Sequence, residues 1–298
     1  MKPRKILLTG VNGQVGHALL PKLSKFQVLA LSRNALDLAN QDDIRRVVRE
    51  TKPDLIINSA AYTAVDKAES ETGLAYAINE KAVQTLAEAA ARLDATLIHF
   101  STDYVYDGTK NAPYVETDAT NPMGVYAKSK LAGEEAIRAV GLPHLILRTS
   151  WVYGAYGKNF LKTIIRLASE RESLHIVADQ FGAPTNGESI ADAVVMLIEN
   201  WQPEQENQMG VYHLTNAGFT SWYDFSCEIV NEYNKLGIEP PLKTHVENIA
   251  AITTADYPMP AARPANSRLN NSKLKQTFGI ELSTWHQGLQ QVMQSLKV

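Results

Sequence analysis

Three glycines near the N-terminus constrain the fold of this chain more than any other feature. Gly10, Gly13 and Gly16 directly follow the short apolar run Ile6–Thr9, and residues with helical periodicity follow over Gln14–Phe26. A strand, a glycine-rich turn and a helix in this order predict the first βαβ unit of a dinucleotide-binding fold. Gly10 permits the tight turn, Gly13 lets the backbone approach a pyrophosphate, and Gly16 lets helix and strand pack closely. The loop lacks the lysine of a P-loop, which disfavours an NTPase.

The rest of the first half alternates between short apolar runs and longer segments of helical periodicity. Further strands are expected at Val28–Leu31, Leu55–Ser59, Thr96–Ser101 and Leu145–Thr149, and helices at Asp42–Thr51, Ala75–Leu93 and Met123–Val140. This alternation predicts an α/β fold, a Rossmann-type doubly wound parallel sheet with helices on both faces. Pro21 is expected to kink or break the first helix.

After Trp151 the pattern becomes less regular. Helices are expected over Phe160–Ser169, Ile190–Glu199, Trp222–Leu236 and Gln287–Leu296, and a strand that returns to the sheet at Val211–Thr215. We therefore expect an NAD(P)-binding domain over residues 1–150, joined again by a segment at about 177–215. Residues 151–298 are expected to form mainly a smaller substrate-binding lobe.

Composition excludes several other classes of protein. The chain has 298 residues and a net charge of −3, which suggests neither a nucleic-acid partner nor a membrane partner. No apolar run approaches the roughly 20 residues that span a bilayer. Cys227 is the single cysteine, so no intramolecular disulfide can form, and no Cys/His cluster suggests zinc. A reducing compartment fits this composition best, and we expect a cytoplasmic location.

The end of the second predicted strand indicates the cofactor. An acidic residue there accepts hydrogen bonds from the ribose 2′-hydroxyl of NAD, but this chain has Ser32 and Arg33. An arginine can form charge-assisted hydrogen bonds with the 2′-phosphate of NADP. Asp37 follows a little later, within reach of the adenine or its ribose. The sequence favours NADPH and leaves NADH as an open alternative.

Three residues predict proton-transfer chemistry. Thr102 directly follows the fourth predicted strand, and Tyr126 and Lys130 lie four residues apart on the next predicted helix. That spacing places both side chains on one helix face, and open α/β sheets bind ligands at the carboxyl ends of their strands. Hydride transfer to a ketone creates an alkoxide, to which Tyr126 can donate a proton. We expect Lys130 to lower the pKa of Tyr126 and to hold the nicotinamide ribose, and Thr102 to orient the carbonyl oxygen.

The glycine loop, the strand-end threonine and the Tyr-x-x-x-Lys pair resemble the extended short-chain dehydrogenase/reductase superfamily. Five further segments narrow the resemblance to the dTDP-4-dehydrorhamnose reductase family: Asn58–Glu69, Ser101–Gly108, Arg148–Gly154, Gln180–Thr185 and Arg263–Leu269. The similarity covers nearly the whole chain. It implies reduction of the C4 ketone of dTDP-4-dehydro-L-rhamnose to dTDP-L-rhamnose, a precursor of cell-surface polysaccharide.

The resemblance also implies ligand contacts. It implies that the cofactor phosphates contact Gly13, Gln14 and Val15. The adenine is expected beside Asp37 and Leu38, and the rest of the cofactor along Ala61, Tyr62 and Thr63. The remaining expected cofactor contacts are Gly10, Asn12, Ser32, Arg33, Ala60, Tyr126 and Lys130. Thr102 and Asp103 are expected to approach the sugar nucleotide, and Trp151 to lie against it.

One departure from the family pattern concerns metal binding. Some members form dimers through a magnesium site that uses a glutamate just inside the first helix. This chain reads Gly16-His17-Ala18-Leu19 at that place, and Glu188 alone does not make a ligand set. We expect no metal requirement, and either a monomer or a metal-independent homodimer.

Other functions stay open beside the reductase. A dehydratase carries an Asp-Glu pair after the strand-end threonine, whereas Asp103 and Tyr104 stand there, which favours reduction. An epimerase keeps NAD bound, and Arg33 argues mildly against one. The intact Tyr126 group argues against a non-catalytic NADP-binding regulatory subunit. The sequence leaves open the nucleotide, the C4 stereochemistry, and whether Arg263 and Arg268 bind the substrate diphosphate or pair within the fold.

Overall fold

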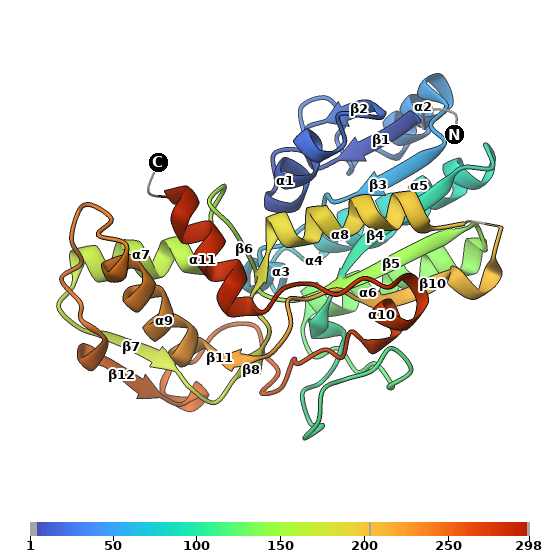
Figure 1. The fold of residues 1–298 in the computed structure, drawn as a ribbon. Helices are drawn as coiled ribbons and strands as arrows, with labels where there is room; N and C mark the ends of the chain where they lie inside the picture. The colour runs from blue at the N-terminus through green and yellow to red at the C-terminus, as the bar shows by residue number, and fades with distance from the viewer. Residues whose placement is uncertain (1–4, 203, 297–298) are drawn as a thin grey trace.

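A six-stranded parallel sheet forms the centre of the molecule in the computed structural model, which describes residues 5–202 and 204–296. Its strand order is β10 (Gly210–His213), β5 (His144–Thr149), β4 (Thr96–Thr102), β3 (Leu55–Asn58), β1 (Lys5–Thr9) and β2 (Gln27–Leu31). Every neighbouring pair is parallel, so all carboxyl ends lie at one edge. The predicted doubly wound sheet is confirmed (Figure 1).

Helices cover both faces of this sheet (Figure 1). One face packs on α1 (Gln14–Lys22), α8 (Gly187–Asn200) and α10 (Ser272–Phe278), and the other on α2 (Gln41–Thr51), α5 (Ala82–Ala91) and α6 (Val125–Val140). Successive strand residues point to opposite faces, so Ile6 and Leu8 join the first core while Leu7 joins the second. Because both faces are covered, these strands are nearly continuous apolar runs.

The predicted strands of the first half are confirmed to within a residue or two, but two helices differ. The first helix ends at Lys22 and not at Phe26, and Pro21 lies in its last turn, where it lacks the N–H that would bond to the carbonyl oxygen of His17. The predicted helix Ala75–Leu93 is observed as α4 (Thr72–Tyr76), a π-helical turn at Ala77–Lys81, and α5. A short helix, α3 (Val65–Ala68), precedes it and was not predicted.

A smaller lobe is built mainly from the second half of the chain (Figure 1). Its core lies between α7 (Phe160–Glu170), α9 (Trp222–Lys235), α11 (Trp285–Leu296) and the paired strands β7 (Leu174–Val177) and β12 (Ile249–Ile252). Four further strands form two short pairs: β6 (Val152–Tyr153) with β9 (Thr185–Asn186), and β8 (Phe181–Gly182) with β11 (Thr220–Ser221). Across the described ranges, no helix is both long and apolar enough to cross a membrane.

The strand predicted at Val211–Thr215 is confirmed as β10, which joins the central sheet beside β5. The strands outside the central sheet were not predicted. Most span only two residues, which is too short for an alternating pattern to show. The fold thus places the carboxyl edge of the central sheet opposite the smaller lobe.

Candidate active site

A cavity of about 1180 Å³ lies at the carboxyl edge of the central sheet. Thr9, Leu31, Thr102 and Thr149, the last residues of four strands, line it, and α7 and β7 of the smaller lobe line its other side. Typical sites for one small ligand occupy roughly 300–1,000 Å³, so this cavity has room for a dinucleotide and a second ligand.

The glycine loop forms one wall of the cavity with the close approaches that the motif predicts. Gly10 has a φ of +74°, and a Cβ there would lie 2.6 Å from the backbone nitrogen of Ala60. A Cβ on Gly16 would lie 2.3 Å from the carbonyl oxygen of Gly10. Gly13 precedes α1 and offers no side-chain cap, so the first N–H groups of the helix are left for a ligand. This arrangement fits an anion such as a pyrophosphate.

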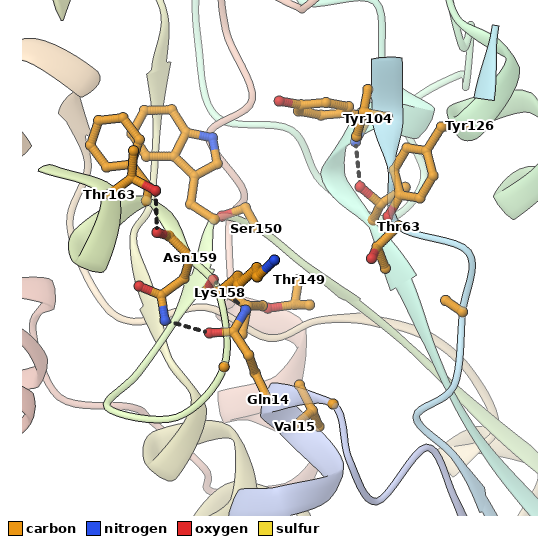
Figure 2. A pocket seen from close by; sticks show the side chains of 18 of the residues that line it. Gln14, Val15, Thr63, Tyr104, Tyr126, Thr149, Ser150, Lys158, Asn159 and Thr163 are labelled. Atoms are coloured by element: carbon orange, nitrogen blue, oxygen red, sulfur yellow. Dashed lines mark hydrogen bonds between the residues drawn. The ribbon is translucent and has the colours of Figure 1, made fainter. Parts of the chain in front are cut away.

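Gln14 joins the glycine loop to the smaller lobe. Its Oε1 accepts a hydrogen bond from Asn159 Nδ2 at 3.0 Å, and its Nε2 donates to the carbonyl oxygen of Val152 at 3.2 Å (Figure 2). Asn159 also caps α7, where its Oδ1 accepts from the backbone N–H of Lys162. Sequence reasoning missed Asn159 as a lining residue. An asparagine directly before a predicted helix is a cap signal, but that signal does not show which cavity it borders.

The residues expected to select the cofactor lie together after the end of β2. Ser32, Arg33, Asp37 and Leu38 all line the cavity. Arg33 is exposed and forms none of the ion pairs found among the described residues. Its guanidinium is therefore available to a phosphate. Asp37 Oδ1 accepts a hydrogen bond from the backbone N–H of Ala39, which orders the turn.

The segment after β3 lines the cavity with one exception. Ala60, Ala61 and Thr63 border it, whereas Tyr62 does not. The Tyr62 hydroxyl donates a hydrogen bond to Glu71 at 2.6 Å, and this bond raises the pKa of Tyr62 to about 12. Asn79 in the π-helical turn holds the backbone of Tyr62, accepting from its N–H and donating to its carbonyl oxygen. The side chain of Tyr62 is thus directed away from the expected cofactor path.

Thr102, Tyr126 and Lys130 all reach the cavity from β4 and α6. The Thr102 hydroxyl donates to Asp103 Oδ1 at 2.9 Å and accepts from the backbone N–H of Tyr104 at 3.2 Å. Tyr104 meets Tyr126 edge to face, with ring centroids 6.3 Å apart. The strand-end threonine and the helix tyrosine therefore share one corner of the cavity.

The expectation that Lys130 lowers the pKa of Tyr126 is wrong for this structure. Burial raises the pKa of Tyr126 to about 12, although a hydrogen bond with Thr102 opposes that rise. Lys130 Nζ instead donates to the carbonyl oxygen of Phe100 at 2.6 Å and lies 3.2 Å from His99 Nε2. Burial also lowers the pKa of Lys130 itself to about 8. The lysine is held by β4 and not by the phenol.

Asp103 has a carboxylate oxygen without a partner. Its Oδ2 is buried and accepts no hydrogen bond from the described residues. Burial raises the pKa of Asp103 to about 7, even though the Ser267 hydroxyl and then the Thr102 hydroxyl oppose the rise. An unpaired buried acceptor beside the cavity is suited to a ligand hydroxyl.

Trp151 is held in a strained conformation against the cavity. Its φ of +47° lies in the left-handed region, which side chains other than glycine rarely adopt. The indole stacks on Trp222 with ring centroids 3.4 Å apart, and a Cβ on Gly182 would lie 2.5 Å from it. Trp222 also lines the cavity and was not predicted to do so. Such strain is found most often at functional sites.

The two arginines left open by the sequence both pair within the fold. Arg263 donates to both carboxylate oxygens of Asp66, at 3.0 and 2.8 Å, although it also borders the cavity. Arg268 donates to Asn266 Oδ1 and to the carbonyl oxygen of Asn111. No group of three or more His, Cys, Asp or Glu side chains that could hold a metal occurs in the described part of the chain.

The chain is similar to known proteins over nearly its whole length. A family model described as RmlD substrate binding domain matches residues 4–298. A dTDP-4-dehydrorhamnose reductase from Burkholderia thailandensis is 48% identical over 285 residues, which cover 94% of this chain and 95% of the relative. A reductase of the same name from Escherichia coli K12 is 44% identical over 296 residues, covering 98% and 97%.

A solved structure supports the same relation. The dTDP-4-dehydrorhamnose reductase from Bacillus anthracis, crystallised in complex with NADP, superposes with a TM-score of 0.89 at 34% sequence identity. The match covers 98% of this chain and 99% of that chain.

Proposed function

The chain belongs to the dTDP-4-dehydrorhamnose reductase family, and on this premise we propose that it reduces the C4 ketone of dTDP-4-dehydro-L-rhamnose with NADPH to give dTDP-L-rhamnose. One observation carries the proposal. The Tyr126 side chain lies beside Thr102 in the same cavity as the glycine loop. Proton donor, carbonyl-orienting hydroxyl and dinucleotide site are thereby combined in one place.

The lining residues fit a nicotinamide dinucleotide. Gly10, Gly13 and the first turn of α1 would hold its pyrophosphate, and Arg33 would pair with a 2′-phosphate, which favours NADPH over NADH. The other proposed contacts along the cavity are Asn12, Gln14, Val15, Ser32, Asp37, Leu38, Ala60, Ala61 and Thr63. When bound, the reduced nicotinamide supplies the hydride.

The side chains supply the proton. Reduction of a ketone adds a hydride to the carbonyl carbon and a proton to its oxygen. The Thr102 hydroxyl orients that oxygen, and Tyr126 donates its phenolic proton to the developing alkoxide. Because burial keeps the pKa of Tyr126 near 12, the phenol carries its proton at neutral pH. Lys130, held on β4 by the carbonyl oxygen of Phe100, would hold the ribose of the nicotinamide.

The sugar nucleotide occupies the remainder of the cavity. Asp103 accepts a hydrogen bond from a sugar hydroxyl through its unpaired Oδ2, and Trp151 lies against the sugar ring. Tyr104 stands where a dehydratase needs a second carboxylate, and burial raises the pKa of this phenol. Acid and base for the removal of water are therefore not both present, which supports simple reduction.

A direct assay tests the proposal. The chain is mixed with NADPH and enzymatically prepared dTDP-4-dehydro-L-rhamnose, and the loss of reduced-nicotinamide absorbance is followed. We expect stoichiometric NADPH oxidation and a dTDP-L-rhamnose product, identified by NMR, with slower turnover of NADH. Absence of NADPH consumption would refute the reductase. Recovery of a stoichiometric partner enzyme in a pull-down would then favour a regulatory subunit, and conversion of dTDP-glucose to a 4-keto sugar would favour a dehydratase.

We also propose the coarse organisation of the protein. Residues 1–150 with the segment at about 177–215 bind the cofactor, supported by the pairing of β10 with β5, and residues 151–298 mainly bind the substrate. The protein acts as a monomer or a metal-independent homodimer. Light scattering after size-exclusion chromatography should give equal masses in magnesium and in EDTA. A cytoplasmic location fits the lone Cys227.

A further inference from the structure

His99 is a fully buried histidine to which the proposed reaction assigns no role. It lies on β4, three residues before Thr102, and none of its surface is accessible. Both ring nitrogens have polar neighbours. Nδ1 lies 3.1 Å from Asn58 Nδ2, and Nε2 lies 3.2 Å from Lys130 Nζ.

These contacts form a continuous buried chain of polar groups. Thr9 Oγ1 donates to Asn58 Oδ1 at 2.6 Å, Asn58 contacts His99, and His99 contacts Lys130. The chain crosses the adjacent strands β1, β3 and β4 and ends on α6. Thr9 directly precedes Gly10, so the chain connects the strand that opens the glycine loop with the lysine of the site.

The chemistry of the donors decides where the protons lie. An ammonium group can only donate, so a charged Lys130 requires His99 Nε2 to be an unprotonated acceptor. The single ring proton of a neutral imidazole must then be on Nδ1. The amide of Asn58 must be turned so that its oxygen accepts from Nδ1 and its Nδ2 donates to Thr9 Oγ1, which reverses the direction of the Thr9–Asn58 hydrogen bond. A neutral Lys130 allows the opposite arrangement, in which Asn58 Nδ2 donates to Nδ1 and Nε2–H donates to the lysine. The tautomer of His99 is therefore tied to the charge of Lys130.

We propose that His99 is a positioning residue that accepts a hydrogen bond from Lys130 through Nε2 and so keeps the lysine charged and directed toward the cavity. The proposal rests on the proposed reductase function. The carbonyl oxygen of Phe100 accepts a second hydrogen bond from Nζ. Among the described residues no third acceptor is within hydrogen-bond distance, which leaves one N–H for a bound ligand.

The charges around Lys130 agree with this role. From its own helix, Glu134 raises the pKa of Lys130, whereas burial, the larger effect, lowers it to about 8. Arg148 of β5 faces Glu134 and pairs with it at 2.6 Å, and Tyr126 lies one turn before Lys130 on α6. His99 on β4 is neutral. Its burial, the larger effect, and the charge of Lys130 both hold its pKa well below its usual value. A neutral acceptor can stabilise the ammonium without adding charge.

The pH dependence of kcat/KM tests this role. His99→Leu removes the acceptor, and His99→Gln retains an oxygen in its place. Hydrogen bonds to charged groups contribute roughly 1.5–3 kcal/mol, so we expect the alkaline limb of His99→Leu to move about 1–2 pH units lower. His99→Gln should restore most of that shift. His144→Leu is the matched control, since His144 is a buried strand histidine whose Nδ1 contacts only the carbonyl oxygen of Leu142.

The ring ¹⁵N NMR signals of His99 in the ligand-free chain, identified by their absence in His99→Gln, test the tautomer without any substrate. We expect proton-bearing Nδ1 and unprotonated Nε2 at neutral pH. Proton-bearing Nε2 would overturn the proposal, as would an alkaline limb of His99→Leu that matches wild type. A wild type that oxidises no NADPH would refute the reductase, while the tautomer measurement would still decide the role of His99.

Discussion

At the scale of single residues, the candidate site keeps its proton donor protonated before reaction. Burial raises the pKa of Tyr126 to about 12, so the phenol carries its proton at neutral pH. A developing alkoxide is a stronger base than a phenolate, so the proton moves from Tyr126 to the substrate oxygen. The spacing of Tyr126 and Lys130 was visible in the sequence, but the depth at which the phenol is buried was not.

Removing the phenolic hydroxyl tests this role. We expect Tyr126→Phe to lower kcat by about 10²-fold or more, because general acid catalysis typically contributes 10²–10⁴-fold. NADPH affinity should change little, since the ring is retained. Steady-state kinetics and fluorescence titration measure the two quantities. Tyr76→Phe, on α4 outside the cavity, is the control. Near-normal turnover in Tyr126→Phe would remove this residue from its role.

The buried carboxyl of Asp103 predicts a dependence of stability on pH. Its pKa is raised by burial from 3.8 to about 7 in the folded chain. Below about pH 4 the carboxyl is protonated in both states. As pH rises from 4 to 7, the unfolded chain loses this proton first, so the native state becomes less stable relative to it. The unpaired acceptor is thus retained at a cost in stability.

Asp103→Asn removes the ionisation and keeps the shape. We expect its free energy of unfolding to exceed that of wild type by up to about 4 kcal/mol at pH 8, and the difference to vanish near pH 4. Urea unfolding at both values measures this. Asp107→Asn should show no gain at pH 8, because hydrogen bonds from Thr109 and Asn121 hold the pKa of Asp107 well below its usual value. Equal stabilities of Asp103→Asn and wild type at pH 8 would contradict the prediction.

At the scale of elements, α6 must pack closely on the π-helical turn to present Tyr126 and Lys130. A Cβ on Gly133 would lie 2.2 Å from the carbonyl oxygen of Asn79 in that turn. Asn79 in turn holds the backbone of Tyr62 and donates to Ser129 at 3.0 Å. The packing of α6 on Asn79 therefore positions both the helix that carries the proton donor and the segment along the cofactor path.

Gly133→Ala tests this packing. The added methyl group must separate α6 from the π-helical turn, so we expect a loss of about 1–3 kcal/mol in the free energy of unfolding, with weaker NADPH binding. Gly73→Ala is the matched control, since no atom lies within 4 Å of its Cβ position, and it should be neutral or stabilising by up to about 1 kcal/mol. Equal unfolding midpoints for Gly133→Ala and wild type would show that the contact has no such role.

At the scale of the whole molecule, the cavity lies between the central sheet and the smaller lobe, whose apolar cores are separate. One connection is the ion pair of Asp66 on α3 with Arg263 in the C-terminal segment, at 2.8 Å. The bond with Arg263, the largest effect, lowers the pKa of Asp66. A ligand that fills the cavity would join the two parts through both walls.

Cofactor binding should therefore stabilise the whole chain. At a concentration 100 times its Kd, NADPH should stabilise the folded state by about 2.7 kcal/mol, which corresponds to a rise in Tm of a few degrees. Differential scanning fluorimetry measures the shift. Arg33→Ala should require roughly 10–100-fold more NADPH for the same shift and little more NADH, because one charged hydrogen-bonding group is lost. If wild type and Arg33→Ala needed the same NADPH concentration for the same rise in Tm, Arg33 would not be the partner of the 2′-phosphate.

Local periodicity and short motifs were enough to predict the strands of the central sheet, the glycine loop, the Tyr126 and Lys130 pair and the family. Long-range packing, which no local pattern shows, makes Arg263 pair with Asp66, turns Tyr62 toward Glu71 and brings His99 to Lys130. These contacts join residues that are 197, 9 and 31 positions apart. The raised pKa values of Tyr126 and Asp103 also depend on the tertiary structure. Burial raises them, and burial is a property of the packed molecule and not of the neighbouring residues along the chain.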